Sequence, residues 1–251
     1  MVSLYTHGTH VASIAVNGNP FARVFAATVI QEHRLQPPKP TEDRSLGLAE
    51  AYREFVKAFQ QQNVRVVNMS WALRADHYER WLAWHGIGDS PEQRQQIAQR
   101  YFEIERDALR SAMATAPEIL FIAGAGNSAD SADFRETIPA SFSLPNLITV
   151  GAVNKAGDET SFSSFGDTVV VHANGVEVDG LLPGGEHTKM LGTSMASPQV
   201  ANLAGKLLAL RPQLTAAEIR EAIIKSAEPR GRVNLIHPRE CAALLGIDLE
   251  D

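Results

Sequence analysis

The stretch NVRVVNMSW, residues 63–71, is a short apolar run that directly follows an amphipathic pattern over residues 45–62. A second apolar run, FARVFAATVI at residues 21–30, lies before that pattern, between the turn-forming segments NGNP and QPPKPTEDRS. Apolar runs of this length between turn signals are typical of buried strands, whereas apolar residues at helical spacing indicate a helix. The three segments therefore predict a strand, a helix and a strand in succession.

The same alternation continues to the end of the chain. Further buried strands are expected at residues 118–126, 146–153 and 167–173, and helices at residues 7–16, 91–116, 194–210 and 215–226. Ser45 or Asp43 is expected to cap the helix over 45–62, and Thr215 with Glu218 forms a capping-box pattern. Apolar strands that alternate with helices predict a three-layer α/β fold, with a mostly parallel sheet covered by helices on both faces. No repeat or linker interrupts the pattern, so we expect one domain over residues 1–251.

Composition and charge limit the classes of partner. The 251 residues are 44% hydrophobic, enough for a substantial core, and carry a formal net charge of −6 without any sustained basic run, which argues against nucleic acid. No segment approaches the roughly 18 apolar residues that a membrane span needs, and residues 1–15 lack the pattern of a secretion signal. Cys241 is alone, so an intramolecular disulfide is excluded. The compartment in which the protein works stays open.

The stretch LGTSMASPQVAN, residues 191–202, places Ser194 where a helix is expected to begin. Backbone N–H groups and the positive end of the helix dipole converge at such a position and would stabilise an oxyanion formed there. Gly192 and Ala196 keep the approach to the serine open. Ordinary helix capping by Thr193 or Ser194 is the alternative explanation.

Two further motifs suggest partners for that serine. His7-Gly8-Thr9-His10 opens another predicted helix and offers an imidazole on a glycine-permitted turn, although His7 and His10 could also form half of a zinc site. The segment GAGN, residues 124–127, ends an apolar strand in glycines, so Asn127 could direct its amide into a cleft as an oxyanion donor. A turn-forming asparagine is the alternative.

Taken in this order, HGTHVA, AGN and GTSMASP resemble the subtilase family of subtilisin-like serine peptidases. The segments VVNMSWA, PASFSLPNLITVGAV, TSFSSFG and PQVANLAGKLLAL extend the resemblance over about residues 5–228, which leaves 229–251 as a C-terminal extension. The resemblance implies a serine endopeptidase in which Ser194 is the nucleophile, His7 the general base and Asn127 the oxyanion donor. It also implies that an extended peptide or protein substrate lies along Ser70, Trp71, Ala72, Gly124, Ala125 and Gly126.

One element of the family pattern is missing. Subtilases carry an aspartate upstream of the HGTH motif to orient the histidine, and only MVSLYT precedes His7. We therefore expect an N-terminally incomplete piece of a longer peptidase, to which an upstream segment or propeptide supplies the acid. Loss of a central strand would leave backbone groups of its neighbours unpaired, which argues against the alternative of a complete, catalytically impaired pseudopeptidase that binds peptides.

Other features leave alternatives open. Asp130 and Asp133 follow Asn127 and could favour basic side chains in the substrate pocket, or could be solvated loop acids. Residues 73–92 resemble an insertion beside that pocket. An esterase of the α/β-hydrolase type is disfavoured, because its pattern needs glycine where Ala196 stands. No cofactor is expected, and the presence of structural calcium stays open because no complete oxygen-ligand loop is visible. Family members are often secreted, but the location of this protein is not fixed by its sequence.

Overall fold

The computed structural model describes residues 2–28, 37–133 and 135–248. Its main sheet has the strand order β1-β2-β3-β4-β8-β7, and all neighbouring pairs are parallel except β7 with β8. The strands are β1 (Val66–Met69), β2 (Leu120–Gly124), β3 (Leu147–Val153), β4 (Val169–Asn174), β7 (Glu228–Arg230) and β8 (Val233–Leu235). An antiparallel hairpin, β5 (Val178–Leu181) with β6 (His187–Met190), forms a separate small sheet.

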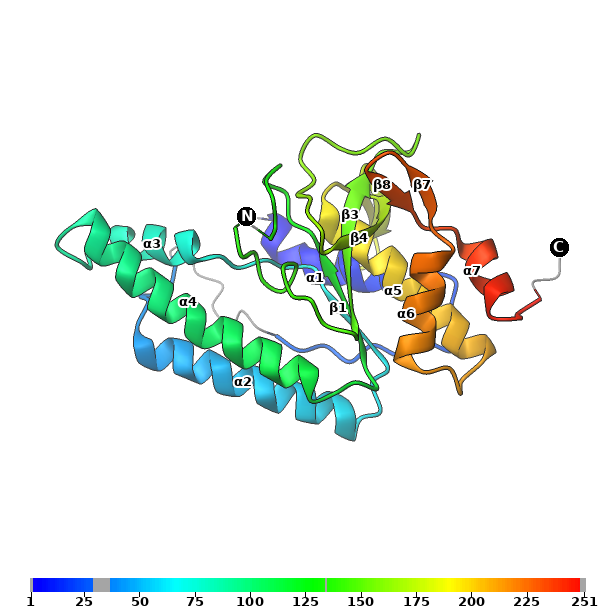
Figure 1. The fold of residues 1–251 in the computed structure, drawn as a ribbon, viewed down its shortest axis with the longest axis horizontal. Coiled ribbons are helices and arrows are strands. Elements are labelled where there is room, and N and C mark those ends of the chain that lie inside the picture. The colour runs from blue at the N-terminus through cyan, green and yellow to red at the C-terminus, as the bar shows by residue number, and fades with distance from the viewer. Residues whose placement is uncertain (1, 29–36, 134, 249–251) are drawn as a thin grey trace.

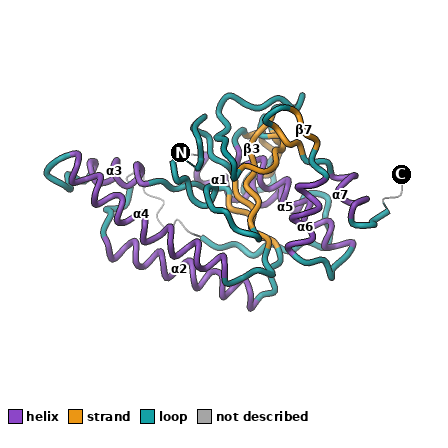
Figure 2. Tube along the Cα trace, in the orientation of Figure 1, coloured by secondary structure: helices purple, strands orange, loops and turns teal. Residues whose placement is uncertain are grey.

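Helices cover both faces of the main sheet, so the predicted α/β fold with a mostly parallel sheet is confirmed (Figure 1). In Figure 2 the strands form a central layer between two groups of helices. One group consists of α1 (Val2–Val16), α5 (Thr193–Leu210), α6 (Ala216–Lys225) and α7 (Pro238–Leu244), and the other of α2 (Glu42–Gln61), α3 (Ala75–Trp84) and α4 (Pro91–Ala114). We call α2, α3 and α4 the helical arm, because α3 and the start of α4 extend beyond the sheet.

The alternation of side chains along β2 explains the layers. Leu120 and Ile122 belong to the apolar core beneath α5 and α6, whereas Phe121 and Ala123 belong to the core beneath the helical arm. Successive residues of a strand point to opposite faces, so one uninterrupted apolar run supplies both cores. This is why β2 is buried along its whole length.

A buried carboxylate joins the three helices of the arm. Glu105 of α4, 1% exposed, accepts hydrogen bonds from Tyr52 of α2, at 3.0 Å, and from Tyr78 of α3. Ser45 of α2 lies within 3.2 Å of the Tyr78 hydroxyl. Burial raises the pKa of Glu105 above its usual range. Ser45 is therefore part of the arm's interior and does not cap α2, whose N-cap is Thr41.

The predicted strand at residues 21–30 is the main error of the sequence-based prediction. Residues 21–28 have no regular secondary structure, and the last two residues of the prediction lie outside the described part. Phe21, Val24 and Phe25 are exposed by 79%, 57% and 49%. An apolar run forms a strand only where another strand supplies backbone partners, and no described strand lies beside this one.

The other predicted elements are present with shifted boundaries. The helix expected at 7–16 begins at Val2, and the glycine-rich connection after β4 contains the β5–β6 hairpin. The capping box of Thr215 and Glu218 is confirmed at α6. Part of the extension from residue 229 onward adds β8 beside β4 and packs α7 against α6. Among the helices that the structure describes, none combines the length and apolar character of a bilayer crossing.

Candidate active site

Ser194 lies in the first turn of α5, where the sequence predicts it. Gly192 is the N-cap residue with φ 136°, a left-handed conformation that favours glycine. A Cβ at Gly192 would lie 3.2 Å from the side-chain Nδ2 of Asn127. Because the backbone N–H of Ser194 belongs to the first turn, it has no acceptor within the helix and remains a donor toward the site.

Asn127 is held in one orientation by Thr193. Its Oδ1 accepts the backbone N–H of Thr193 at 2.8 Å and the Thr193 hydroxyl at 3.1 Å. The Thr193 hydroxyl oxygen in turn accepts the N–H of Gly126 at 3.2 Å. With Oδ1 occupied by donors of α5, the Nδ2 donor of Asn127 stands beside the N-terminus that carries Ser194. Two donors of the kind that stabilise an oxyanion are thus brought together from segments far apart in the chain.

The hydroxyl of Ser70 connects the segment after β1 to α5. It donates to the carbonyl of Ser194 at 2.9 Å, accepts from Asn68 Nδ2 at 2.9 Å and lies 3.0 Å from the Ser197 hydroxyl. A hydroxyl has one proton, so Ser197 must be the donor toward Ser70. Pro198 explains the arrangement, since it has no N–H to offer the Ser194 carbonyl one turn earlier. Ser70 replaces the missing helical hydrogen bond.

The nucleophile candidate itself points toward Ser70. Ser194 is half-buried, and its Oγ donates to the Ser70 carbonyl at 3.3 Å. Ser194 and Ser70 therefore exchange hydrogen bonds in both directions. Within the described residues no hydrogen bond joins the Ser194 hydroxyl to His7.

His7 lies inside α1, which begins at Val2, and not on the glycine-permitted turn that the sequence predicts; α1 packs against α5. Val11 and Ile14 of α1 form an apolar cluster with Met195, the residue after Ser194. His7 is four residues before Val11 and therefore shares that side of α1. Burial, and secondarily the neighbouring charge of His10, lower the pKa of His7 below 6.5. The fold thus brings the helix that carries the candidate base against the helix that carries the candidate nucleophile, and His7 is neutral at pH 7.

His10 has a different environment. It is fully buried, its Nε2 lies 3.1 Å from the Thr188 carbonyl, and its ring lies directly against Gly180 of the hairpin. Its Nδ1 has no hydrogen-bond partner in the described structure. Among residues 2–28, 37–133 and 135–248, no group of three or more histidine, cysteine, aspartate or glutamate residues could hold a metal ion. His10 is placed to attach the β5–β6 hairpin to α1.

The predicted substrate-binding residues lie in different environments. Ala72 is exposed, whereas Trp71 is half-buried and its ring stacks on Tyr52 of the helical arm, with centroids 6.2 Å apart. Gly124 packs against Thr193, since a Cβ there would lie 3.1 Å from that residue's carbonyl. Ala125 is fully buried and its N–H is used by β3. The accessible part of this set is Ala72 together with the half-buried Ser70, Trp71 and Gly126.

Thr193, Asn68 and Pro198 are the residues of this arrangement that sequence reasoning did not assign to the site. Thr193 and Pro198 stand inside the GTSMASP motif, so proximity to Ser194 was the only available signal. Thr193 binds Asn127, 66 positions earlier, and the Ser194 carbonyl that Pro198 cannot serve binds Ser70, 124 positions earlier. The sequence shows no local pattern that would pair them.

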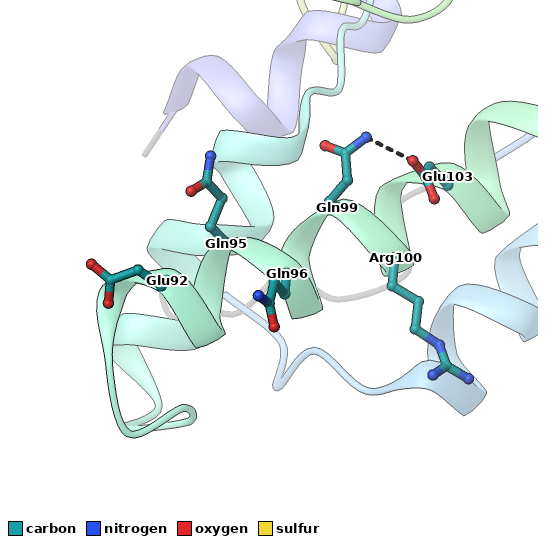
Figure 3. A pocket seen from close by; sticks show the side chains of 6 residues that line it. All are labelled: Glu92, Gln95, Gln96, Gln99, Arg100 and Glu103. Atoms are coloured by element: carbon teal, nitrogen blue, oxygen red, sulfur yellow. Dashed lines mark hydrogen bonds between the residues drawn. The ribbon is translucent and has the colours of Figure 1, made fainter.

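Two hollows of the surface lie away from Ser194. One, of about 580 Å³, runs along the outer face of α4 and is lined only by polar and charged side chains of that helix, among them Gln99 and Glu103, which share a hydrogen bond (Figure 3). It contains none of the residues around Ser194. A solvated helix face of this kind holds no converging groups that could act on a ligand.

Comparison with known proteins identifies the family of this chain. The sequence profile of the Subtilase family matches residues 2–240. The chain belongs to the subtilase family. The Subtilisin of Bacillus pumilus is 39% identical over 109 residues, which cover 43% of this chain and 39% of that protein. Subtilisin DY of Bacillus licheniformis is 38% identical over 126 residues, or 49% of this chain and 46% of the relative. This subtilase thus spans less than half the length of these curated relatives.

Solved structures support the same fold. The prenylagaramide maturation protease PagA superposes with a TM-score of 0.64 at 22% identity, covering 97% of this chain and 83% of that one. A cold-adapted subtilisin-like serine proteinase gives a TM-score of 0.57 at 23% identity, covering 91% and 70%. At these identities the likeness establishes the fold of this subtilase.

Proposed function

We propose that this subtilase is a serine endopeptidase in which Ser194 attacks the peptide carbonyl, His7 acts as general base and Asn127 stabilises the oxyanion. The observation that carries the proposal is the orientation of Asn127. With its Oδ1 bonded to Thr193, its Nδ2 and the N–H of Ser194 lie at the same helix N-terminus. Two such donors at the start of a helix, beside a serine, have the composition of an oxyanion hole.

The reaction follows from these roles. His7 takes the proton from Ser194 as its oxygen adds to the substrate carbonyl, and returns that proton to the departing amine. The Nδ2 of Asn127 and the N–H of Ser194 donate to the negatively charged oxygen of the tetrahedral intermediate. Water then hydrolyses the acyl-enzyme with His7 again as base. An extended peptide or protein substrate pairs with the backbone of Ser70 to Ala72 as an added strand.

We further propose that a strand outside residues 1–251 lies beside β1 and carries the acid that orients His7. Three observations support it. Among the described strands, β1 pairs only with β2, so its other edge is free. Phe21, Val24 and Phe25, which follow α1, expose large apolar side chains. The buried Oδ1 of Asn68, on β1, has no hydrogen-bond partner in the described structure.

One observation favours the alternative of a peptide-binding pseudopeptidase. The Ser194 hydroxyl donates to the Ser70 carbonyl at 3.3 Å, which leaves the nucleophile inactive until an imidazole takes over that proton. A chain that lacks an oriented base would keep the groove beside Ser70 to Ala72 and bind peptides without cleaving them.

Labelling with a fluorophosphonate distinguishes the two functions, with Ser194→Ala as the matched control. For a peptidase we expect the intact mass of the folded chain to rise by one adduct, and the His7→Ala variant to react more slowly. Asn127→Ala should lower peptide turnover by about 10²–10³-fold, the loss known for subtilisin itself when its oxyanion asparagine is removed. Absence of labelling in a folded, full-length product that still binds peptides would contradict the peptidase and support the binding protein.

A further inference from the structure

An ion pair lies beyond Ser70–Ala72 and Gly124–Gly126, the two segments that are proposed to hold the substrate. Arg74, two residues after Ala72, donates from Nη1 to Oδ2 of Asp130 at 2.8 Å. Asp130 follows Asn127 by three residues. The pair therefore joins the continuations of the two segments that are proposed to hold the substrate.

Both members of the pair are shielded from solvent and firmly attached. The side chains of Arg74 and Asp130 are 15% and 24% exposed. Arg74 also binds Asp76 of α3 through Nε and Nη2, at 3.0 and 2.8 Å. Asp130 Oδ1 accepts the hydroxyl of Ser164 at 3.1 Å. Neither the guanidinium of Arg74 nor the carboxylate of Asp130 can rotate toward solvent without breaking several hydrogen bonds.

Asp130 is linked to Gly126, one of the proposed substrate-binding residues, through Ser164. The Oγ of Ser164 would be only 3.1 Å from a Cβ at Gly126. Because glycine has no side chain, Ser164 is the nearest group at this position, with Thr137 next to it, and the Asp130 carboxylate follows as the partner of the Ser164 hydroxyl. On the opposite side, Leu73 exchanges two backbone hydrogen bonds with Ile138, both at 3.0 Å, which fixes the segment from which Arg74 extends.

The sequence left open whether Asp130 and Asp133 attract basic side chains. Asp133 accepts the Thr168 hydroxyl at 2.6 Å, and Asp130 is engaged by Arg74. Arg135 is a second cation near Asp130, at 3.7 Å, but its side chain is 59% exposed. The acid behind the pocket is therefore already neutralised by a cation of the protein.

We propose that Arg74 determines the charge preference of this substrate pocket. Its guanidinium occupies Asp130, so the pocket accepts apolar side chains at the residue before the cut and disfavours lysine and arginine. Removing the guanidinium while keeping the aliphatic stem leaves the carboxylate, among the described cations, with only the exposed Arg135, at 3.7 Å, so that it attracts a basic side chain more strongly. The proposal rests on the proposed peptidase function, because it assigns the substrate class of the same groove.

The test compares Arg74→Met with the unmodified chain on two peptides that differ only by leucine or lysine before the cut. We expect the ratio of kcat/KM for lysine over leucine to rise about fivefold, which corresponds to about 1 kcal/mol, the upper range for a partly exposed charge pair. The double variant Arg74→Met/Asp130→Asn should return the ratio to its original value. Asp76→Asn is the matched control, since it removes the other partner of Arg74 and leaves Asp130 paired.

A second measurement separates this proposal from the peptidase function. Binding of the same two peptides to the Ser194→Ala chain is followed by fluorescence anisotropy, with and without Arg74→Met, and thermal unfolding checks that each variant is folded. One outcome is that Arg74→Met changes the binding preference of the Ser194→Ala chain while the full-length chain that keeps Ser194 cleaves neither peptide. That outcome would support the role of Arg74 and contradict the peptidase. Cleavage with an unchanged ratio in folded Arg74→Met would contradict the role of Arg74 alone, and neither cleavage nor binding would contradict both.

Discussion

Replacing Ser70 by alanine should destabilise the protein more than its half-buried position suggests. The substitution leaves the Ser194 carbonyl without a donor, because Pro198 cannot provide one. It also leaves the fully buried Ser197 hydroxyl and the Asn68 amide without their acceptor. Each unsatisfied buried group costs about 1–3 kcal/mol, so the two most buried of them together imply a loss of about 2–6 kcal/mol.

Thermal unfolding followed by circular dichroism measures this loss. For a chain of this size, 1 kcal/mol corresponds to about 2–4 °C, so we expect the Tm of Ser70→Ala to fall by about 4–24 °C. Ser143→Ala is the control, since Ser143 is exposed, and its effect should stay within about 0.5 kcal/mol.

A double-mutant cycle with Pro198→Ala tests the cause. Alanine at 198 restores an N–H that can bond the Ser194 carbonyl within α5, so Ser70→Ala should cost about 1–2 kcal/mol less in the Pro198→Ala background. Equal costs in both backgrounds would refute the compensation between Ser70 and Pro198, and an unchanged Tm for Ser70→Ala would refute the whole hydrogen-bond argument.

Three further outcomes follow from the structure. Burial raises the pKa of Glu105 above 4.5, so just above that pH the folded state binds more protons than the unfolded state. The stability of the protein therefore falls as the pH rises through this window. Glu105→Gln should flatten the dependence of Tm on pH, whereas the control Glu103→Gln, on the exposed face of α4, should not. Gly192→Ala should lower both Tm and fluorophosphonate labelling, since φ is 136° and the new Cβ meets the side chain of Asn127; full labelling of this variant would contradict the placement of that amide. The rate of labelling should rise with pH through a midpoint below 6.5, because burial lowers the pKa of His7, and a midpoint above 6.5 would show that an acid already pairs with this imidazole.

Elements set by local patterns were predicted well. The apolar run at 118–126 gives β2, and Thr215 with Glu218 starts α6 as the capping box requires. The run at residues 21–30 has the same kind of pattern, yet residues 21–28 form no strand. A strand needs a neighbour for its backbone groups, and the presence of a neighbour is not encoded in the run itself.

The candidate site shows the same difference between what local patterns predict and what the tertiary structure adds. The sequence by itself indicated which residues are proposed to carry the chemistry, because HGTHVA, AGN and GTSMASP are local motifs, although His7 lies inside α1 and not on the turn that the sequence predicts. Only the tertiary structure decided how they are held: Thr193 orients Asn127, Ser70 compensates for Pro198, and Arg74 neutralises Asp130. These contacts join residues 56 to 124 positions apart, and such pairings are fixed by the packing of layers rather than by the periodicity of any one segment.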